Sequence, residues 1–110
     1  MTTLDILVAA RAKISTPETW CQTVVARDSE GLSVVVDDPA ACQWCAMGAL
    51  LLVCNRDTEA VHRAAEYLCW GLVGYNDNPE TCHADIMAMF DAAIVAQPQP
   101  ARGDVPMETP

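Results

Sequence analysis

The sequence predicts an all-α fold: a single-domain bundle of about five helices around a buried central helix, with one extended arm. The length of 110 residues suits one domain with a modest core. Apolar residues make up 52% of the chain, too many for a disordered protein, and they recur at helical spacing between turn signals. We therefore assign residues 1–96 to one helical domain and the proline-rich residues 97–110 to a flexible tail.

Turn and capping signals place the N-terminal elements. Apolar side chains at helical spacing predict an amphipathic helix over residues 4–14. A threonine, a proline and a glutamate at positions 16–18 are typical of a helix start, so we expect a short second helix over residues 17–27. Residues 32–36 are rich in valine, but the sequence offers no second strand to pair with them, so we expect an extended arm on the core.

The longest uncharged stretch of the chain predicts the central helix. Residues 39–54 carry no charge, and a helix that is apolar on every face is normally buried. Gly48 would let a neighbouring element approach this helix closely. We expect Asp57 to cap the next helix, whose apolar stripe runs to Leu72, and a last helix over about residues 80–96.

The charge balance narrows the possible functions. The net charge of −9, from 15 acidic and 6 basic residues, argues against direct binding of nucleic acid and against docking on an anionic membrane. The chain starts without a basic region followed by a cleavable apolar run, so we expect a cytoplasmic protein with reduced cysteines. A suitable partner is a protein with a basic surface, or one whose site normally receives nucleic acid.

Three short stretches resemble a known family. They are the run Trp44-Cys45-Ala46-Met47-Gly48-Ala49-Leu50, the pair Asn76-Asp77, and the run from His83 to Ile94. A weaker likeness extends from about Arg11 to Ala96. Their pattern (W-C-A-x-G-A-L, N-D, H-A-[ED]) is similar to that of a family of small uncharacterised proteins from bacteria and their phages. Cys82 and Asp85 stand where this family usually has threonine and glutamate, which weakens its capping box. The resemblance implies a shared helical fold and points to Trp44, Cys45, Asn76, Asp77 and His83, but it implies no activity.

Cys45 and His83 are the candidates for catalysis. A cysteine hydrolase needs a thiol beside an imidazole and a third group that orients the ring, which Asn76 or Asp77 would supply. Against this, the predicted central helix places Cys45 far from a helix N-terminus, where the thiol pKa would be lowered. The competing interpretation is a buried core thiol and a histidine that bonds carbonyls of the loop at residues 76–79.

Redox and metal chemistry have weaker support. Cys42 and Cys45 form a C-x-x-C pair, but a thioredoxin-like site needs that pair at a helix start after a strand, within a βαβ unit. For zinc, the second pair of ligands would be Cys82 and His83, which are adjacent, whereas zinc ligands are spaced more widely. We therefore expect no metal and no cofactor.

Trp70 is the candidate for an interface. On a continuous helix it falls opposite the apolar stripe, on the side of Glu59 and Glu66. Either the helix ends early or the indole faces solvent, and exposed tryptophans are common anchors at interfaces. The competing interpretation is that Trp70 packs under the loop at residues 74–79 or under the extended arm.

Two functions lead the ranking, and a Cys/His metal site is the third possibility. The leading one is a non-enzymatic protein-interaction or regulatory protein whose partner is another protein. The family resemblance adds that a phage or mobile element carries it and that the partner belongs to the host. The alternative is a small cysteine-dependent hydrolase that uses Cys45 and His83.

Overall fold

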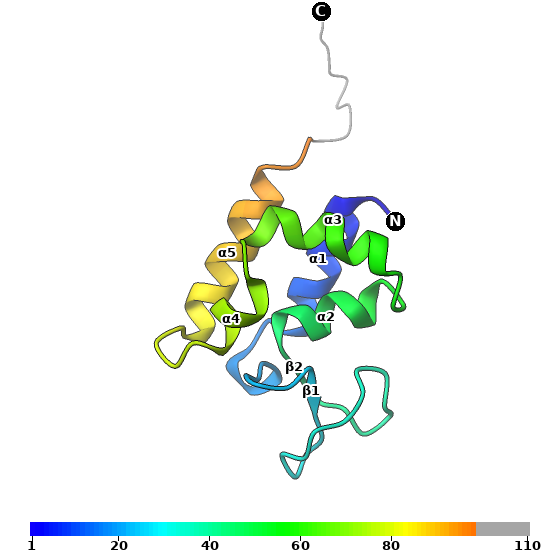
Figure 1. The fold of residues 1–110 in the computed structure, drawn as a ribbon, viewed down its shortest axis with the longest axis vertical. Coiled ribbons are helices and arrows are strands. Elements are labelled where there is room, and N and C mark those ends of the chain that lie inside the picture. The colour runs from blue at the N-terminus through cyan, green and yellow to red at the C-terminus, as the bar shows by residue number, and fades with distance from the viewer. Residues whose placement is uncertain (99–110) are drawn as a thin grey trace, which may run out of the picture.

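The computed structural model describes residues 1–98, which form a mostly helical fold (Figure 1). The α-helices of this part of the chain are α1 (Thr3–Lys13), α2 (Ala46–Val53), α3 (Thr58–Leu68), α4 (Leu72–Asp77) and α5 (His83–Val95). Between α1 and α2 lie a 3₁₀-helix, η1 (Pro17–Thr19), and two short strands, β1 (Ala26–Arg27) and β2 (Gln43–Trp44). The tail predicted over residues 97–110 lies outside the described residues from position 99 onward.

The core lies where α1, α2, α3 and α5 meet. Helix α1 packs against each of the other three, and Leu7 within it and Ile14 just after it are fully buried. Leu50 from α2, and Ile86 and Phe90 from α5, complete the group of the largest buried apolar side chains. Full burial of side chains of this size contributes about 1.5–3 kcal/mol each. Contacts between helices distant in sequence therefore hold the domain together.

Helix α2 is shorter than the sequence predicts. The uncharged run over residues 39–54 predicts one long helix, but α2 begins only at Ala46. Residues 42–45 are extended instead, and the amide of Cys45 donates to the carbonyl of Val25. A run without charge is consistent with a buried helix or with a buried strand, so periodicity could not separate them. The prediction is wrong for the first half of the run.

Gly48 is the point of closest approach between α2 and the segment before β1. A Cβ at this position would overlap the carbonyl of Val25. The prediction that Gly48 admits a close neighbour is therefore confirmed. Only a residue without a side chain leaves room for this contact.

A small antiparallel sheet, formed by β1 and β2, replaces the second helix and the free arm. The helix predicted over residues 17–27 is limited to η1. Residues 32–36 do not form a separate arm but fold back towards β1, where the amide of Val34 donates to the carbonyl of Ala26. The wholly helical prediction is wrong here because these backbone groups pair with segments that local spacing does not reveal.

The chain breaks between α3 and α4. Asp57 caps α3 as predicted, but this helix ends at Leu68 rather than continuing towards Leu72. Gly71 then adopts a left-handed conformation, with φ of 65°, and starts α4. The break places Leu72 in the core from a different helix and leaves Trp70 in the connection.

Candidate functional site

Asn76 lies at the centre of a buried polar network at the end of α4. Its side-chain oxygen accepts the indole N–H of Trp20 at 2.7 Å and the backbone N–H of Ala46 at 3.0 Å. Its side-chain nitrogen donates to the carbonyl of Cys21 at 3.1 Å and to Oδ1 of Asp77 at 2.9 Å. An amide side chain has two donor hydrogens and two acceptor positions. All the hydrogen-bonding capacity of Asn76 is therefore used within the fold.

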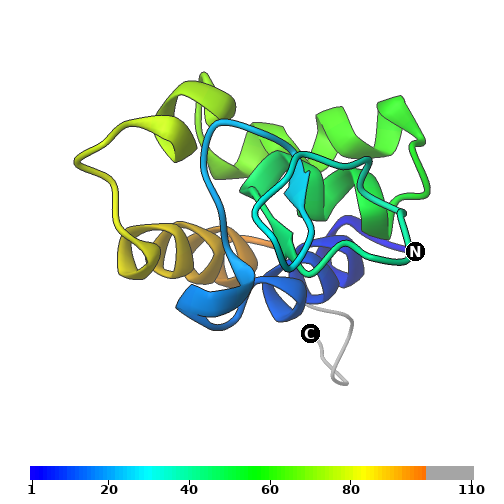
Figure 2. The same cartoon turned by 90° about the horizontal axis from the view of Figure 1, so that it is seen from below.

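Asp77 and Gln22 extend this network. Oδ1 of Asp77 also accepts the backbone N–H of Thr23 at 2.8 Å, and Thr23 has a positive φ of 75°, which is uncommon for threonine. The side-chain nitrogen of Gln22 donates to the carbonyls of Asn76 at 2.9 Å and Asn78 at 3.0 Å. Figure 2 shows the connection from η1 to β1 looping beside α4. These polar side chains therefore fasten that connection to the end of α4.

Cys45 is the N-cap of α2 rather than a residue in the middle of a helix. Its sulfur accepts the backbone N–H of Gly48 at 3.2 Å. Burial nevertheless raises the pKa of Cys45, because the residue is only 4% exposed. Backbone hydrogen bonds at the helix start, from Gly48 first, act in the opposite direction but are outweighed, and the charge of Asp77 adds to the increase in pKa. The surroundings of Cys45 thus disfavour the thiolate form of its side chain.

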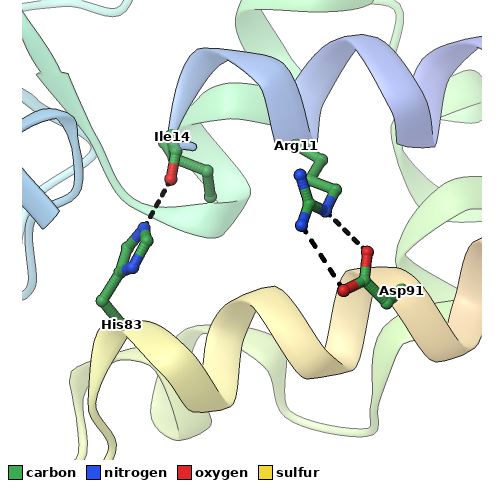
Figure 3. Close-up of polar contacts among 4 residues, drawn as sticks. All are labelled: Arg11, Ile14, His83 and Asp91. Atoms are coloured by element: carbon green, nitrogen blue, oxygen red, sulfur yellow. Dashed lines mark hydrogen bonds and ion pairs between the residues drawn. The ribbon is translucent and has the colours of Figure 1, made fainter. Parts of the chain in front are cut away.

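His83 joins the start of α5 to the end of α1 (Figure 3). Its Nε2 lies 2.7 Å from the carbonyl oxygen of Ile14, and because a carbonyl only accepts, Nε2 carries the hydrogen. The prediction that His83 bonds carbonyls of the loop at residues 76–79 is therefore wrong. Its partner, Ile14, is the C-cap of α1, where carbonyls lack partners within the helix. Further along the same two helices, Nε of Arg11 lies 2.7 Å from Oδ1 of Asp91.

The four catalytic candidates do not meet as a catalytic set. Within residues 1–98 no hydrogen bond joins Cys45 to His83: the sulfur accepts from Gly48, and Nε2 of the imidazole bonds Ile14. Asn76 reaches the imidazole only indirectly, because it binds the indole of Trp20, whose ring centroid lies 6.0 Å from that of His83. A cysteine nucleophile needs its base within hydrogen-bond reach. The arrangement therefore gives the thiol and the imidazole structural contacts rather than a shared reaction centre.

The remaining cysteine and histidine residues do not gather into a metal site. Among the described residues no group of three Cys, His, Asp or Glu side chains is placed to hold a metal ion. All six cysteines lie in this part of the chain and carry free thiols. The carboxylate of Asp85 accepts the backbone N–H of Cys82 at 3.0 Å, so the start of α5 keeps the acidic half of a capping box.

Trp70 lies entirely in solvent, with an exposed fraction of 101%. Together with Glu66 it lines a hollow of about 380 Å³ between the end of α3 and the start of α4. We call this the Trp70 hollow, and its walls are Met47, His62, Ala65, Glu66, Cys69, Trp70, Gly71 and Leu72. Glu59, the third predicted interface residue, is not among these walls, and its carboxylate lies 3.9 Å from Arg63.

Further large apolar side chains are exposed on the same stretch of chain, and the sequence analysis missed them. They are Tyr67, Val73 and Tyr75. Tyr67 lines a second groove, of about 510 Å³, with residues 2–5 and 97–98. The signal available in the sequence was the pair of aromatic residues three positions apart, Tyr67 and Trp70. Both positions lie off the apolar stripe of α3, and the helix break leaves Trp70 in the connection to α4.

The chain that follows α3 is acidic. From residue 64 to residue 98 the sequence contains no lysine or arginine, but it contains Glu66, Asp77, Glu80, Asp85 and Asp91. Within the described part of the chain, Glu66 forms no ion pair or hydrogen bond. The Trp70 hollow therefore combines an exposed indole with an unpaired carboxylate.

None of the helices described is long and apolar enough to cross a membrane. A family model with the description "Family of unknown function (DUF6197)" matches residues 1–96. No curated protein and no solved structure matches the chain. The comparisons thus relate the helical domain to a protein family but supply no activity.

Proposed function

We propose that this chain, which belongs to the family of unknown function DUF6197, is a non-enzymatic protein-interaction or regulatory protein that binds a protein partner through Trp70. The observation that carries the proposal is the complete exposure of the Trp70 side chain. Leaving a large apolar side chain in water forgoes about 1.5–3 kcal/mol of burial free energy. Tryptophan is also enriched among the few residues that dominate binding energy at interfaces.

The other two tryptophans support this assignment by contrast. Trp20 and Trp44 are half-buried, and their indole N–H groups donate to Asn76 at 2.7 Å and to the carbonyl of Val36 at 2.9 Å. The indole of Trp70 has no such partner among the described residues. Its apolar ring and its polar N–H are both free for contact with another protein.

The backbone around Trp70 supports the same role. The preceding residue, Cys69, is extended, and the following Gly71 is left-handed, so the side chain is held outside both flanking helices. Because α3 and α4 flank this short connection, the indole is presented from a defined position rather than from a long loop. A backbone that is already held in place loses less conformational entropy on binding.

The proposal also covers the genetic element that carries the protein and its location in the cell. A phage or mobile element carrying the protein, with a host protein as partner, is supported by the family resemblance alone. A cytoplasmic location is supported by the six free thiols, which a reducing compartment maintains. The net charge of −9 favours a protein partner over nucleic acid or an anionic membrane.

The alternative, a small cysteine-dependent hydrolase, has one observation in its favour: Cys45 stands at a helix N-terminus. This position favours a reactive thiolate in many enzymes. The burial of Cys45 and the engagement of His83 with Ile14 oppose it. We therefore rank the binding function first.

Affinity capture from the native host, followed by mass spectrometry, tests the proposal. The bait is wild-type protein, Trp70→Ser, or Leu32→Ser, which removes another exposed apolar side chain from the connection between β1 and β2. The proposal expects one protein to be captured by wild type and by Leu32→Ser but lost with Trp70→Ser. Equal capture by all three folded baits would reject Trp70 as the anchor.

A further inference from the structure

We propose that the Trp70 hollow receives a cationic side chain, an arginine or lysine from a basic segment of the partner protein. This inference rests on the proposed function and adds the chemistry of the occupant. Three observations support it. The hollow contains the carboxylate of Glu66, the last carbonyls of α3 accept no backbone hydrogen bond from residues 69–72, and the chain's own cationic side chains have other contacts.

The walls of the hollow include both apolar and charged groups, as the binding of such a side chain requires. The apolar surfaces of Met47, Ala65 and Leu72 suit the aliphatic stem of an arginine or lysine. The carboxylate of Glu66 and the face of the Trp70 indole suit the charged end, through an ion pair and a cation–π contact. The chain makes one contact of this kind internally, where Nζ of Lys13 lies 5.9 Å from the ring centroid of Trp44.

The end of α3 adds a second attraction for positive charge. This helix ends at Leu68, and two residues of its last turn, Ala65 and Glu66, line the hollow. No backbone N–H from residues 69–72 donates to the last carbonyls of α3 within the described chain. Free carbonyls at a helix C-terminus carry partial negative charge and accept hydrogen bonds from cations.

A second copy of this chain is a poor occupant. The lysine and arginines within residues 1–98 each have a contact within the chain: Arg11 with Asp91, Lys13 with the Trp44 ring, Arg27 with backbone carbonyls, Arg56 with Asp37, and Arg63 with Glu59. Two copies, each with a net charge of −9, also repel each other. The charge of the hollow therefore favours a different, basic protein.

The experiment uses the three indole N–H signals of ¹⁵N-labelled full-length protein, with the Trp70 signal assigned by its loss in Trp70→Phe. The probe is an acetylated, amidated Gly-Arg-Gly-Arg-Gly peptide. The control probe replaces each arginine with citrulline, which has nearly the same shape but no charge. We expect the arginine peptide to shift the Trp70 signal saturably while the Trp20 and Trp44 signals stay fixed, and the citrulline peptide to shift none.

Two matched variants test whether the carboxylate of Glu66 attracts the arginine peptide. Glu66→Gln should weaken arginine-peptide binding by about threefold, as expected for an exposed ion pair. Glu59→Gln, on the same helix but outside the hollow, should leave it unchanged. Equal effects of the two variants, equal binding of the citrulline peptide, absence of any shift, or a shift that depends only on protein concentration would each overturn the inference; the last result would identify a second copy.

Failure of this inference is distinct from failure of the proposed function. If the arginine peptide does not bind but Trp70→Ser still abolishes capture of the partner, the binding function stands and only the cationic occupant is rejected. If Trp70→Ser captures the partner normally, the proposed function is rejected whatever the peptide does.

Discussion

At the scale of single residues, the candidate side chains fall into two groups, buried and exposed. Asn76 and Cys45 are buried and bonded to backbone groups, whereas Trp70 is exposed and Glu66 is unpaired. The sequence identified these residues by chemical type. It could not show their burial, because the hydrogen bonds that decide it join distant positions, such as Trp20 and Asn76.

Replacing Asn76 with alanine should destabilise the fold strongly. The variant removes four hydrogen bonds and leaves buried donors and acceptors from Trp20, Ala46 and Cys21 unpaired. Unpaired buried groups cost about 1–3 kcal/mol each before relaxation, so we expect a loss of about 3 kcal/mol in the free energy of unfolding. Urea unfolding measures this, with Asn78→Ala as the exposed control. A loss below about 0.5 kcal/mol, typical of surface changes, would contradict the structural role of Asn76.

Cys45 should react slowly with an alkylating reagent at neutral pH. Burial raises its pKa above the usual value of a thiol, so the nucleophilic thiolate is scarce at neutral pH. Peptide mapping after iodoacetamide treatment should show Cys45 labelled at least about tenfold more slowly than the exposed Cys42. Rapid labelling of Cys45 that His83→Ala abolishes without unfolding the protein would instead support the hydrolase alternative.

At the scale of elements, local signals succeeded where helices begin at strong caps. Asp57 starts α3 as predicted, and α5 occupies most of the predicted last helix. They failed over residues 17–27 and 39–45, where backbone pairing between distant segments decides the structure. They also failed at the end of α3. The apolar spacing continues to Leu72, but the helix ends at Leu68 and Gly71 is left-handed.

Two glycine-to-alanine variants test the packing of α2 against the segment before β1. Gly48→Ala places a Cβ on the Val25 carbonyl, and because that obstacle is backbone we expect a loss of about 1–3 kcal/mol in stability. Gly74→Ala, in α4, meets open space, and alanine favours a helix, so it should be neutral or stabilise by up to about 1 kcal/mol. Thermal or urea unfolding of both variants checks this. Equal effects would show that α2 does not lie against Val25.

At the scale of the whole molecule, the residues that stabilise the fold differ from those that we propose bind the partner. The helices meet in one apolar core, and the buried network fastens the connection from η1 to β1 onto α4. The Trp70 hollow lies at the junction of α3 and α4 and exposes its anchor to solvent. Composition showed the acidity and the spacing of apolar residues predicted the helical class, but the place of the hollow depends on tertiary structure that neither contains.

The acidic surface should make binding sensitive to salt. Raising the salt concentration from about 50 to about 500 mM shortens electrostatic screening from above about 10 Å to a few ångströms. We therefore expect the affinity for a basic partner to fall by about tenfold, mainly through slower association. Surface plasmon resonance at several salt concentrations measures both rate constants. An affinity that does not change with salt would show that apolar contact alone drives binding.

The most direct test of the central claim is the dissociation constant of the captured partner for Trp70→Ser and Leu32→Ser, measured by isothermal titration calorimetry. Both variants remove an exposed apolar side chain, so both should fold as wild type does. If Trp70 is the anchor, Trp70→Ser should weaken binding by about thirtyfold or more, the loss expected for a binding hot spot, while Leu32→Ser stays within about twofold of wild type. Equal dissociation constants for the two variants and wild type would contradict the account.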